Sequence, residues 1–143
     1  MRLRKWHLTC GLALILLAAS ACSFTTANIS SLKLSKDEKG ESETSTFAPG
    51  ETIYARATVS NVPSKVTLKW QLIAEKVQGQ QENYHVPQLD KSFDIPNDGV
   101  GTYSLSPPPA GWPAGKYRIE VGMFIENGQE KDHKTTTFTV SGG

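Results

Sequence analysis

An all-β fold, an antiparallel two-sheet β-sandwich of about seven strands, is predicted by three features of this 143-residue sequence. Apolar and polar residues alternate with a period of two in several segments, which is typical of half-buried strands. Turn signals rich in Pro, Gly and Asn separate these segments. No segment of ten or more residues has the 3.6-residue period of an amphipathic helix. Many short strands between turns favour a sandwich, and a closed barrel is the less favoured alternative.

The clearest alternation occurs in segments 53–59, 66–74 and 117–125, where the large apolar side chains fall on one face. Trp70 is in the middle of the second segment, where a large ring can fill the space between two packed sheets. Four further strands are expected at residues 29–34, 92–95, 101–105 and 135–140.

Two turns are expected to set the hairpin geometry. Asn127-Gly128 suits a type I′ turn because both residues accept a positive φ. In Ala48-Pro49-Gly50, Pro presets φ at the second turn position and Gly accepts a positive φ at the third, so we expect a type II turn.

The N-terminal 21 residues have the pattern of a cleaved signal peptide. Basic residues precede an apolar run from residue 8 to residue 19, and Ala19-Ser20-Ala21 supplies the small residues of a cleavage site. The apolar run is shorter than the ~20 residues that span a bilayer. The sequence therefore predicts an exported protein.

Cys22 directly follows these small residues, and the segment resembles the lipobox of bacterial lipoproteins, although Ala19 stands where that family most often has Leu. The resemblance implies that Cys22 carries a diacylglyceryl group and anchors the protein to a membrane. Ser23 in place of Asp implies the outer membrane, or a periplasm-facing position, if the cell is Gram-negative. The alternative is an ordinary cleavage site with Cys22 as an unmodified first residue. Residues 22–28 would form the lipidated Cys and a polar spacer, and residues 29–141 the domain.

The composition of the chain after residue 21 limits its partners. Three of the fifteen basic residues precede residue 22, which leaves twelve against fourteen acidic residues and a formal charge of −2. No basic cluster alternates with aromatic residues, so we expect no nucleic acid partner. Cys10 is lost with the signal peptide, so no internal disulfide is expected and the core alone must stabilise the fold.

Trp70, and Tyr117 after Pro113-Ala114-Gly115, resemble the core tryptophan and the tyrosine corner of immunoglobulin-like and fibronectin type III-like domains. The resemblance extends to small exported bacterial domains of the immunoglobulin-like class, which are often lipoprotein or accessory modules. It implies an immunoglobulin-like domain over residues 29–141, and it implies no particular chemistry.

Catalytic and metal-binding signatures are lacking in the sequence. There is no Gly-x-Ser-x-Gly elbow, His-Glu-x-x-His helix or phosphate-binding loop. His133 is near Glu130 and Asp132, but on a regular strand it would point away from both. We therefore expect a protein that is not an enzyme and that holds no metal or cofactor.

The candidate ligand surface consists of Trp112, Tyr103 and Tyr54. Trp112 follows three prolines and precedes a fourth, and with the two tyrosines it could form an exposed aromatic surface for carbohydrate. The favoured alternative is that Trp112 packs over the end of the sandwich and is buried. The expected function is a non-catalytic, membrane-anchored lipoprotein with an interaction domain for another envelope protein, and a carbohydrate-binding module is the alternative.

Overall fold

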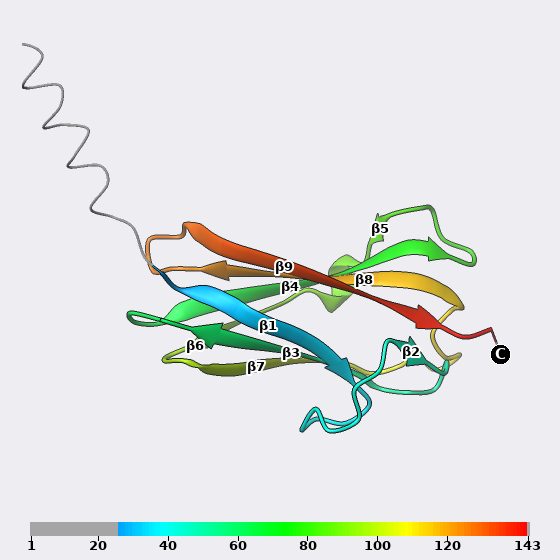
Figure 1. Ribbon diagram of the computed structural model, residues 1–143. Coiled ribbons are helices and arrows are strands. Elements are labelled where there is room, and N and C mark those ends of the chain that lie inside the picture. Colours follow the sequence, from blue (N-terminus) through cyan, green and yellow to red (C-terminus); the bar gives the residue numbers. More distant parts are fainter. Residues whose placement is uncertain (1–25, 143) are drawn as a thin grey trace, which may run out of the picture.

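The computed structural model describes residues 26–142, whose strands form two sheets packed face to face (Figure 1). The elements are β1 (Asn28–Ser35), β2 (Thr46–Phe47), β3 (Ile53–Ser60), β4 (Val66–Val77), β5 (Tyr84–His85), the 3₁₀ turn η2 (Pro87–Leu89), β6 (Lys91–Ile95), β7 (Gly99–Leu105), β8 (Gly115–Phe124) and β9 (Glu130–Val140). Within these described residues no helix is long and apolar enough to cross a membrane.

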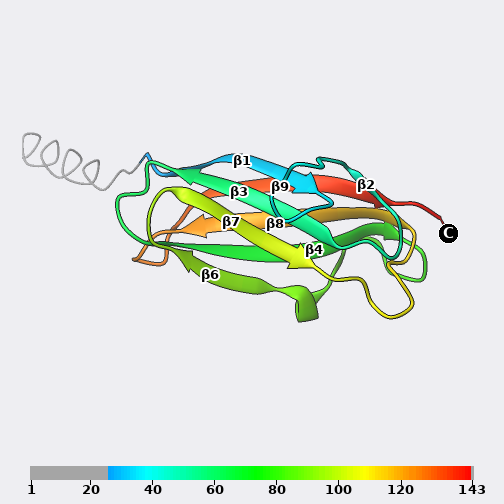
Figure 2. The same ribbon diagram turned by 90° about the horizontal axis from the view of Figure 1, so that it is seen from below.

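The first sheet has the order β1-β3-β7, and the second has the order β2-β9-β8-β4, with β5 and β6 both pairing with β4 (Figure 2). All the pairings are antiparallel except that of β2 with β9. The predicted two-sheet β-sandwich is confirmed, and the two sheets do not close into a barrel. The seven expected strands are present. The two-residue strands β2 and β5 were missed because two residues cannot display a period.

The core fills the space between the two sheets with the side chains that alternation predicted to face inward. Trp70 is fully buried and stacks on Tyr103, with ring centroids 5.1 Å apart, and on Phe93 at 6.4 Å. Because Trp70 and Phe93 belong to one sheet and Tyr103 to the other, these rings join the two layers. Fully burying one large aromatic side chain stabilises a fold by about 1.5–3 kcal/mol.

A bulge interrupts the pairing of β4 with β8 between Ala74 and Lys76. It shifts the alternation by one residue, so that Val77 is buried at the end of the strand. The bulged backbone lies close to Gly115, whose φ is +146°, and a Cβ at Gly115 would lie 2.3 Å from the carbonyl oxygen of Lys76. Only glycine fits this position.

The hairpin between β8 and β9 is not the predicted type I′ turn. Only Gly128 has a positive φ, +86°, while Asn127 does not. The Gly128 amide donates to the Ile125 carbonyl at 2.9 Å, and the Asn127 side-chain oxygen accepts from the Gln129 amide at 2.8 Å. A three-residue turn with glycine in the left-handed position results, because the Asn127 side chain stabilises its own backbone without a positive φ.

The turn at Pro49-Gly50 is present but is not of type II. The Glu51 amide donates to the Ala48 carbonyl at 3.1 Å, which closes the turn, yet Gly50 does not have a positive φ. The Glu51 carboxylate accepts from the Ala48 amide at 2.8 Å. This second bond stabilises a turn in which Gly50 needs no special conformation.

The predicted signal peptide 1–21 and Cys22 lie outside the described residues. The described chain begins at the end of the sandwich that carries the β8–β9 hairpin, opposite the end where the chain terminates (Figure 1). There the Ile29 amide donates to the Asp132 carboxylate at 2.8 Å, which ties the start of β1 to β9 in the other sheet.

Replacing Gly115 with alanine should destabilise the domain by roughly 2–3 kcal/mol, because the new methyl group meets the Lys76 carbonyl and the φ is unfavourable for alanine. Gly50→Ala is the matched control, since nothing lies within 4 Å of its added Cβ, and it should be neutral or slightly stabilising. Urea unfolding of both variants measures the difference; equal stabilities would contradict the close approach at Gly115.

Candidate functional site

The exposed aromatic surface of Trp112, Tyr103 and Tyr54 does not form. Trp112 and Tyr103 are only 6% and 1% exposed. Tyr103 packs inside the sandwich, and its hydroxyl donates to the Leu89 carbonyl at 2.6 Å. Tyr54 is half-buried and alternates with the buried Ala55 on β3, so it lies on the opposite, outer face of its sheet. Tyr103 and Tyr54 therefore cannot contact one ligand together.

Trp112 instead packs over one end of the sandwich, which is the alternative favoured from the sequence. Its indole N–H donates to the Glu51 carbonyl at 3.0 Å, and its amide donates to the Pro49 carbonyl at 2.8 Å. Its ring packs edge to face on the Tyr117 ring, with centroids 6.3 Å apart and an angle of 71° between the ring planes. These contacts bind the loop 106–114 to the turn before β3.

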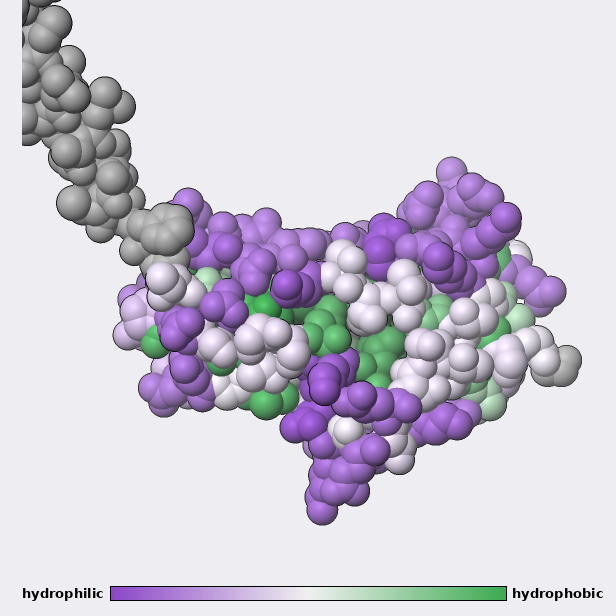
Figure 3. All heavy atoms as spheres, in the orientation of Figure 1, coloured by the Kyte–Doolittle hydropathy of each residue, from purple (hydrophilic) through white to green (hydrophobic). Residues whose placement is uncertain are grey.

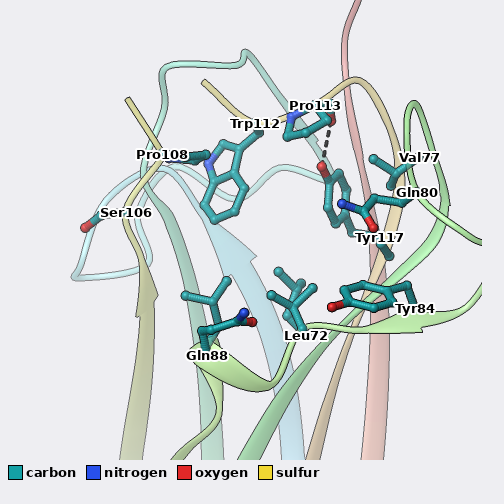
Figure 4. Close-up of a pocket in the computed structure, with 13 residues that line it drawn as sticks. Leu72, Val77, Gln80, Tyr84, Gln88, Ser106, Pro108, Trp112, Pro113 and Tyr117 are labelled. Carbon is teal, nitrogen blue, oxygen red and sulfur yellow. Dashed lines mark hydrogen bonds between the residues drawn. The ribbon is translucent and has the colours of Figure 1, made fainter. Parts of the chain in front are cut away.

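Next to Trp112 the end of the sandwich contains a cavity of about 440 Å³, which we call the distal hollow (Figure 4). Its floor consists of Leu72 and Ala74 of β4 and Tyr117 of β8. One wall is the segment 84–89, which includes β5 and η2, and the facing wall is the loop 106–114.

The hollow exists because no strand pairs continuously along this side of β4. β6 pairs with β4 only from Val66 to Trp70, and β5 pairs only with Ile73 and Ala74. Between them η2 turns away from the sheet edge, and its Leu89 carbonyl is held by the Tyr103 hydroxyl. The walls are therefore separate segments, each fixed by its own hydrogen bonds.

The lining of the hollow is apolar and uncharged. None of the thirteen lining residues is an acid, a lysine, an arginine or a histidine. The Gln80 and Gln88 side-chain amides point into the space from different sides, while the Ser106 hydroxyl points away (Figure 4). Tyr84, which is 38% exposed, lies at the base of the wall formed by the segment 84–89, beside Leu72. A concave apolar site with a few convergent polar groups is the usual form of a ligand pocket.

Sequence reasoning missed Tyr84, Gln80 and Gln88, because they lie in segments whose pattern indicates only a polar loop and a weak edge strand. The apolar residues Val86 and Leu89 beside Tyr84 were the available signal that this segment covers apolar surface. Trp112 is the one lining residue that the sequence indicated as a ligand contact.

Tyr117 holds the loop 106–114, one wall of the hollow, in place. Its hydroxyl donates to the Pro113 carbonyl at 2.6 Å. Its ring stacks on Phe138, with centroids 5.0 Å apart and planes 4° from parallel. Burial raises the pKa of Tyr117 to about 12, so the hydroxyl is neutral and can donate at any physiological pH.

His133 does not point away from Glu130, which corrects the expectation from regular strand alternation. A bulge opposite Met123 and Phe124 brings both side chains to one face, and the His133 ring lies 2.9 Å from the Glu130 carboxylate and 3.4 Å from that of Glu120. Partial burial opposes the charged form, but these two carboxylates outweigh it and raise the pKa of His133. Asp132 lies on the other face, where it binds the Ile29 amide.

Across residues 26–142 no group of three or more His, Cys, Asp or Glu side chains is arranged to hold a metal ion. A second hollow of about 310 Å³ lies where β1 approaches β9. It opens on the face drawn in Figure 3, which also shows a strip of apolar surface between polar residues. The ion pair of Lys33 with Glu43, at 3.1 Å, lies at its edge. Most of its lining is polar or charged, so the distal hollow is the better candidate site.

No family model and no curated protein matches this chain. Among solved structures it is similar to the C-terminal domain of Wzt, with 12% identity, a TM-score of 0.50 and coverage of 84% of this chain and 76% of that one. It is also similar to the PmoD soluble domain from Methylocystis sp. ATCC 49242, with 13% identity, a TM-score of 0.47 and coverage of 83% of this chain and 94% of that one. A β-glucosidase from Listeria innocua, in complex with glucose, gives 14% identity and a TM-score of 0.48, but this chain spans only 16% of it. At such identities the likeness concerns the fold alone, that of a small all-β domain.

The buried tyrosines should make the domain unstable to alkali. Above pH 10 the unfolded chain loses tyrosine protons that the folded chain keeps, because burial raises the pKa values of Tyr117 and Tyr103. The free energy of unfolding should therefore fall as pH rises from 10 toward 12, by up to about 1.4 kcal/mol per pH unit for each tyrosine. Tyr117→Phe should make this fall shallower while lowering stability at pH 7 by about 1 kcal/mol through loss of the Pro113 bond. Guanidinium unfolding at several pH values measures both effects; identical slopes for the two proteins would contradict the prediction.

Proposed function

We propose that this chain is an exported lipoprotein, anchored in a bacterial envelope membrane through Cys22, whose immunoglobulin-like sandwich binds another envelope protein without catalysing a reaction. The observation that carries the binding role is the distal hollow, an apolar, uncharged cavity at the end of the sandwich opposite the start of the described chain. A hollow without charged groups, whose one serine hydroxyl points away from the space, suits binding better than catalysis.

The position of the hollow supports a role at a distance from the membrane. Residues 22–28 reach at most about 25 Å, and the twelve residues of β4 extend for about 40 Å along the sandwich. A lipid on Cys22 would therefore lie near the end with the β8–β9 hairpin, and the hollow would face away from that membrane.

Replacing Cys22 with serine should release the protein from the membrane, because the thiol that would carry the lipid is lost. Fractionation of cells into membrane and soluble pools, with metabolic labelling by an alkyne fatty acid, measures the change. Cys10→Ser is the matched control, since this residue precedes the expected cleavage site, and the variant should remain membrane-bound and labelled. Unlabelled wild-type protein in the soluble pool would refute the anchor.

Carbohydrate binding is the second candidate, favoured by the Trp112 and Tyr84 rings and the Gln80 and Gln88 amides that share one cavity. Sugars stack on aromatic rings and bond to amides. A glycan array probed with the domain, and with Tyr84→Ala as the control, tests it. Binding to one class of glycan that the Tyr84 variant loses would establish this role, and an array without hits would remove it.

A further inference from the structure

We propose that the distal hollow is an anchor pocket for an uncharged, apolar peptide segment of the partner, with a proline or aliphatic side chain packed against Trp112, Tyr117 and Tyr84. This inference rests on the proposed function, because it names the chemistry by which the envelope partner is recognised.

The absence of charged residues from the lining of the hollow excludes ionic ligand groups. Since its lining residues are uncharged, a carboxylate, phosphate or ammonium group would lose its hydration without gaining an ion pair. Leaving a charge unpaired in such a place is strongly unfavourable. The inserted group is therefore neutral.

The polar groups of the hollow match a peptide backbone. Gln80 and Gln88 point into the space from different sides (Figure 4), and each side-chain amide carries both a donor and an acceptor. A peptide unit also has one donor and one acceptor. The two glutamines can thus satisfy a main-chain amide, while the aromatic rings and Pro108 contact the adjoining apolar side chain.

The size of the hollow suits an anchor rather than a whole interface. About 440 Å³ is within the range of small ligand pockets, which is roughly 300–1,000 Å³. Protein interfaces often gain most of their affinity from one or two bulky groups in such pockets. Aromatic-lined grooves also bind extended proline-rich segments at a low entropic cost.

Two other occupants fit less well. A buried hexose has several hydroxyl groups, and the Ser106 hydroxyl points away, so the two glutamines and Tyr84 would leave some of them without partners. An acyl chain from the anchoring membrane would have to cross the length of the sandwich, about 40 Å, to reach the hollow.

Selection of a random peptide library displayed on phage against the domain tests the proposal while the partner is still unidentified. We expect enrichment of uncharged sequences with proline or aliphatic residues. Synthetic versions should bind the wild type, and Gln88→Trp, which fills the hollow with an indole ring, should weaken binding by about tenfold or more. Gln71→Trp is the matched control, because Gln71 is exposed on β4 and does not line the hollow.

Thermal unfolding of each variant shows that it is folded, and Tyr84→Ala, at a surface-exposed position, gives a second test of the hollow. Selected peptides that are charged, or that bind Gln88→Trp as well as they bind the wild type, would overturn the proposal. A selection without enrichment would also overturn the proposal. The same holds if a glycan, or the neutral probe N-phenyl-1-naphthylamine, binds in the hollow while no peptide does.

Cross-linking of the full-length protein in its own envelope separates this inference from the proposed function. A partner that cross-links to wild type and Gln71→Trp but not to Gln88→Trp supports both. If Gln88→Trp still cross-links to the partner, the proposed interaction is supported but the contact lies elsewhere on the domain. That result would refute the hollow as the anchor. The absence of any partner for the wild type contradicts the proposed function itself.

Discussion

The hydrogen bond between the Tyr117 hydroxyl and the Pro113 carbonyl holds the distal end of the molecule together. It fixes the loop 106–114 against β8, and the same loop carries Trp112, whose ring then meets Tyr117. Phe138 stacks on the other side of Tyr117, and Phe47 packs edge to face on Phe138 with centroids 5.6 Å apart. Because Trp112 and Tyr117 both line the hollow, its shape depends on one buried phenol that stays protonated.

The fold was predictable because alternation is a property of many residues at once. In β3, and in β4 as far as Ala74, every second side chain faces the core, so single exceptions could not obscure the pattern. The two turn types were predicted wrongly, since each depends on one side chain that competes for a backbone amide. Asn127 binds the Gln129 amide and Glu51 binds the Ala48 amide, and neither bond follows from residue preferences alone.

The candidate site was predictable only at Trp112. Its other walls come from segments that are far apart in sequence and that have no period of their own. Bulges add a further difficulty, because one extra residue reverses the direction of every later side chain. Glu130 and His133 meet for this reason, whereas regular pleating would have separated them. Functional surfaces built from irregular segments are the part of such a domain that sequence patterns describe least well.

The bond between Ile29 and Asp132 has a mechanical consequence for the anchored protein that we propose. A pull between the N-terminal attachment and a partner held at the distal end would act along the strands. The hydrogen bonds from β1 to β3 run across that direction, so they would carry the load together, in shear, and would not open one after another. The Asp132 carboxylate, which accepts from the Ile29 amide, would share the force at the start of β1. Under such a pull, the pairing of β1 with β3, which extends from Asn28 to Ser35, would resist separation as a unit.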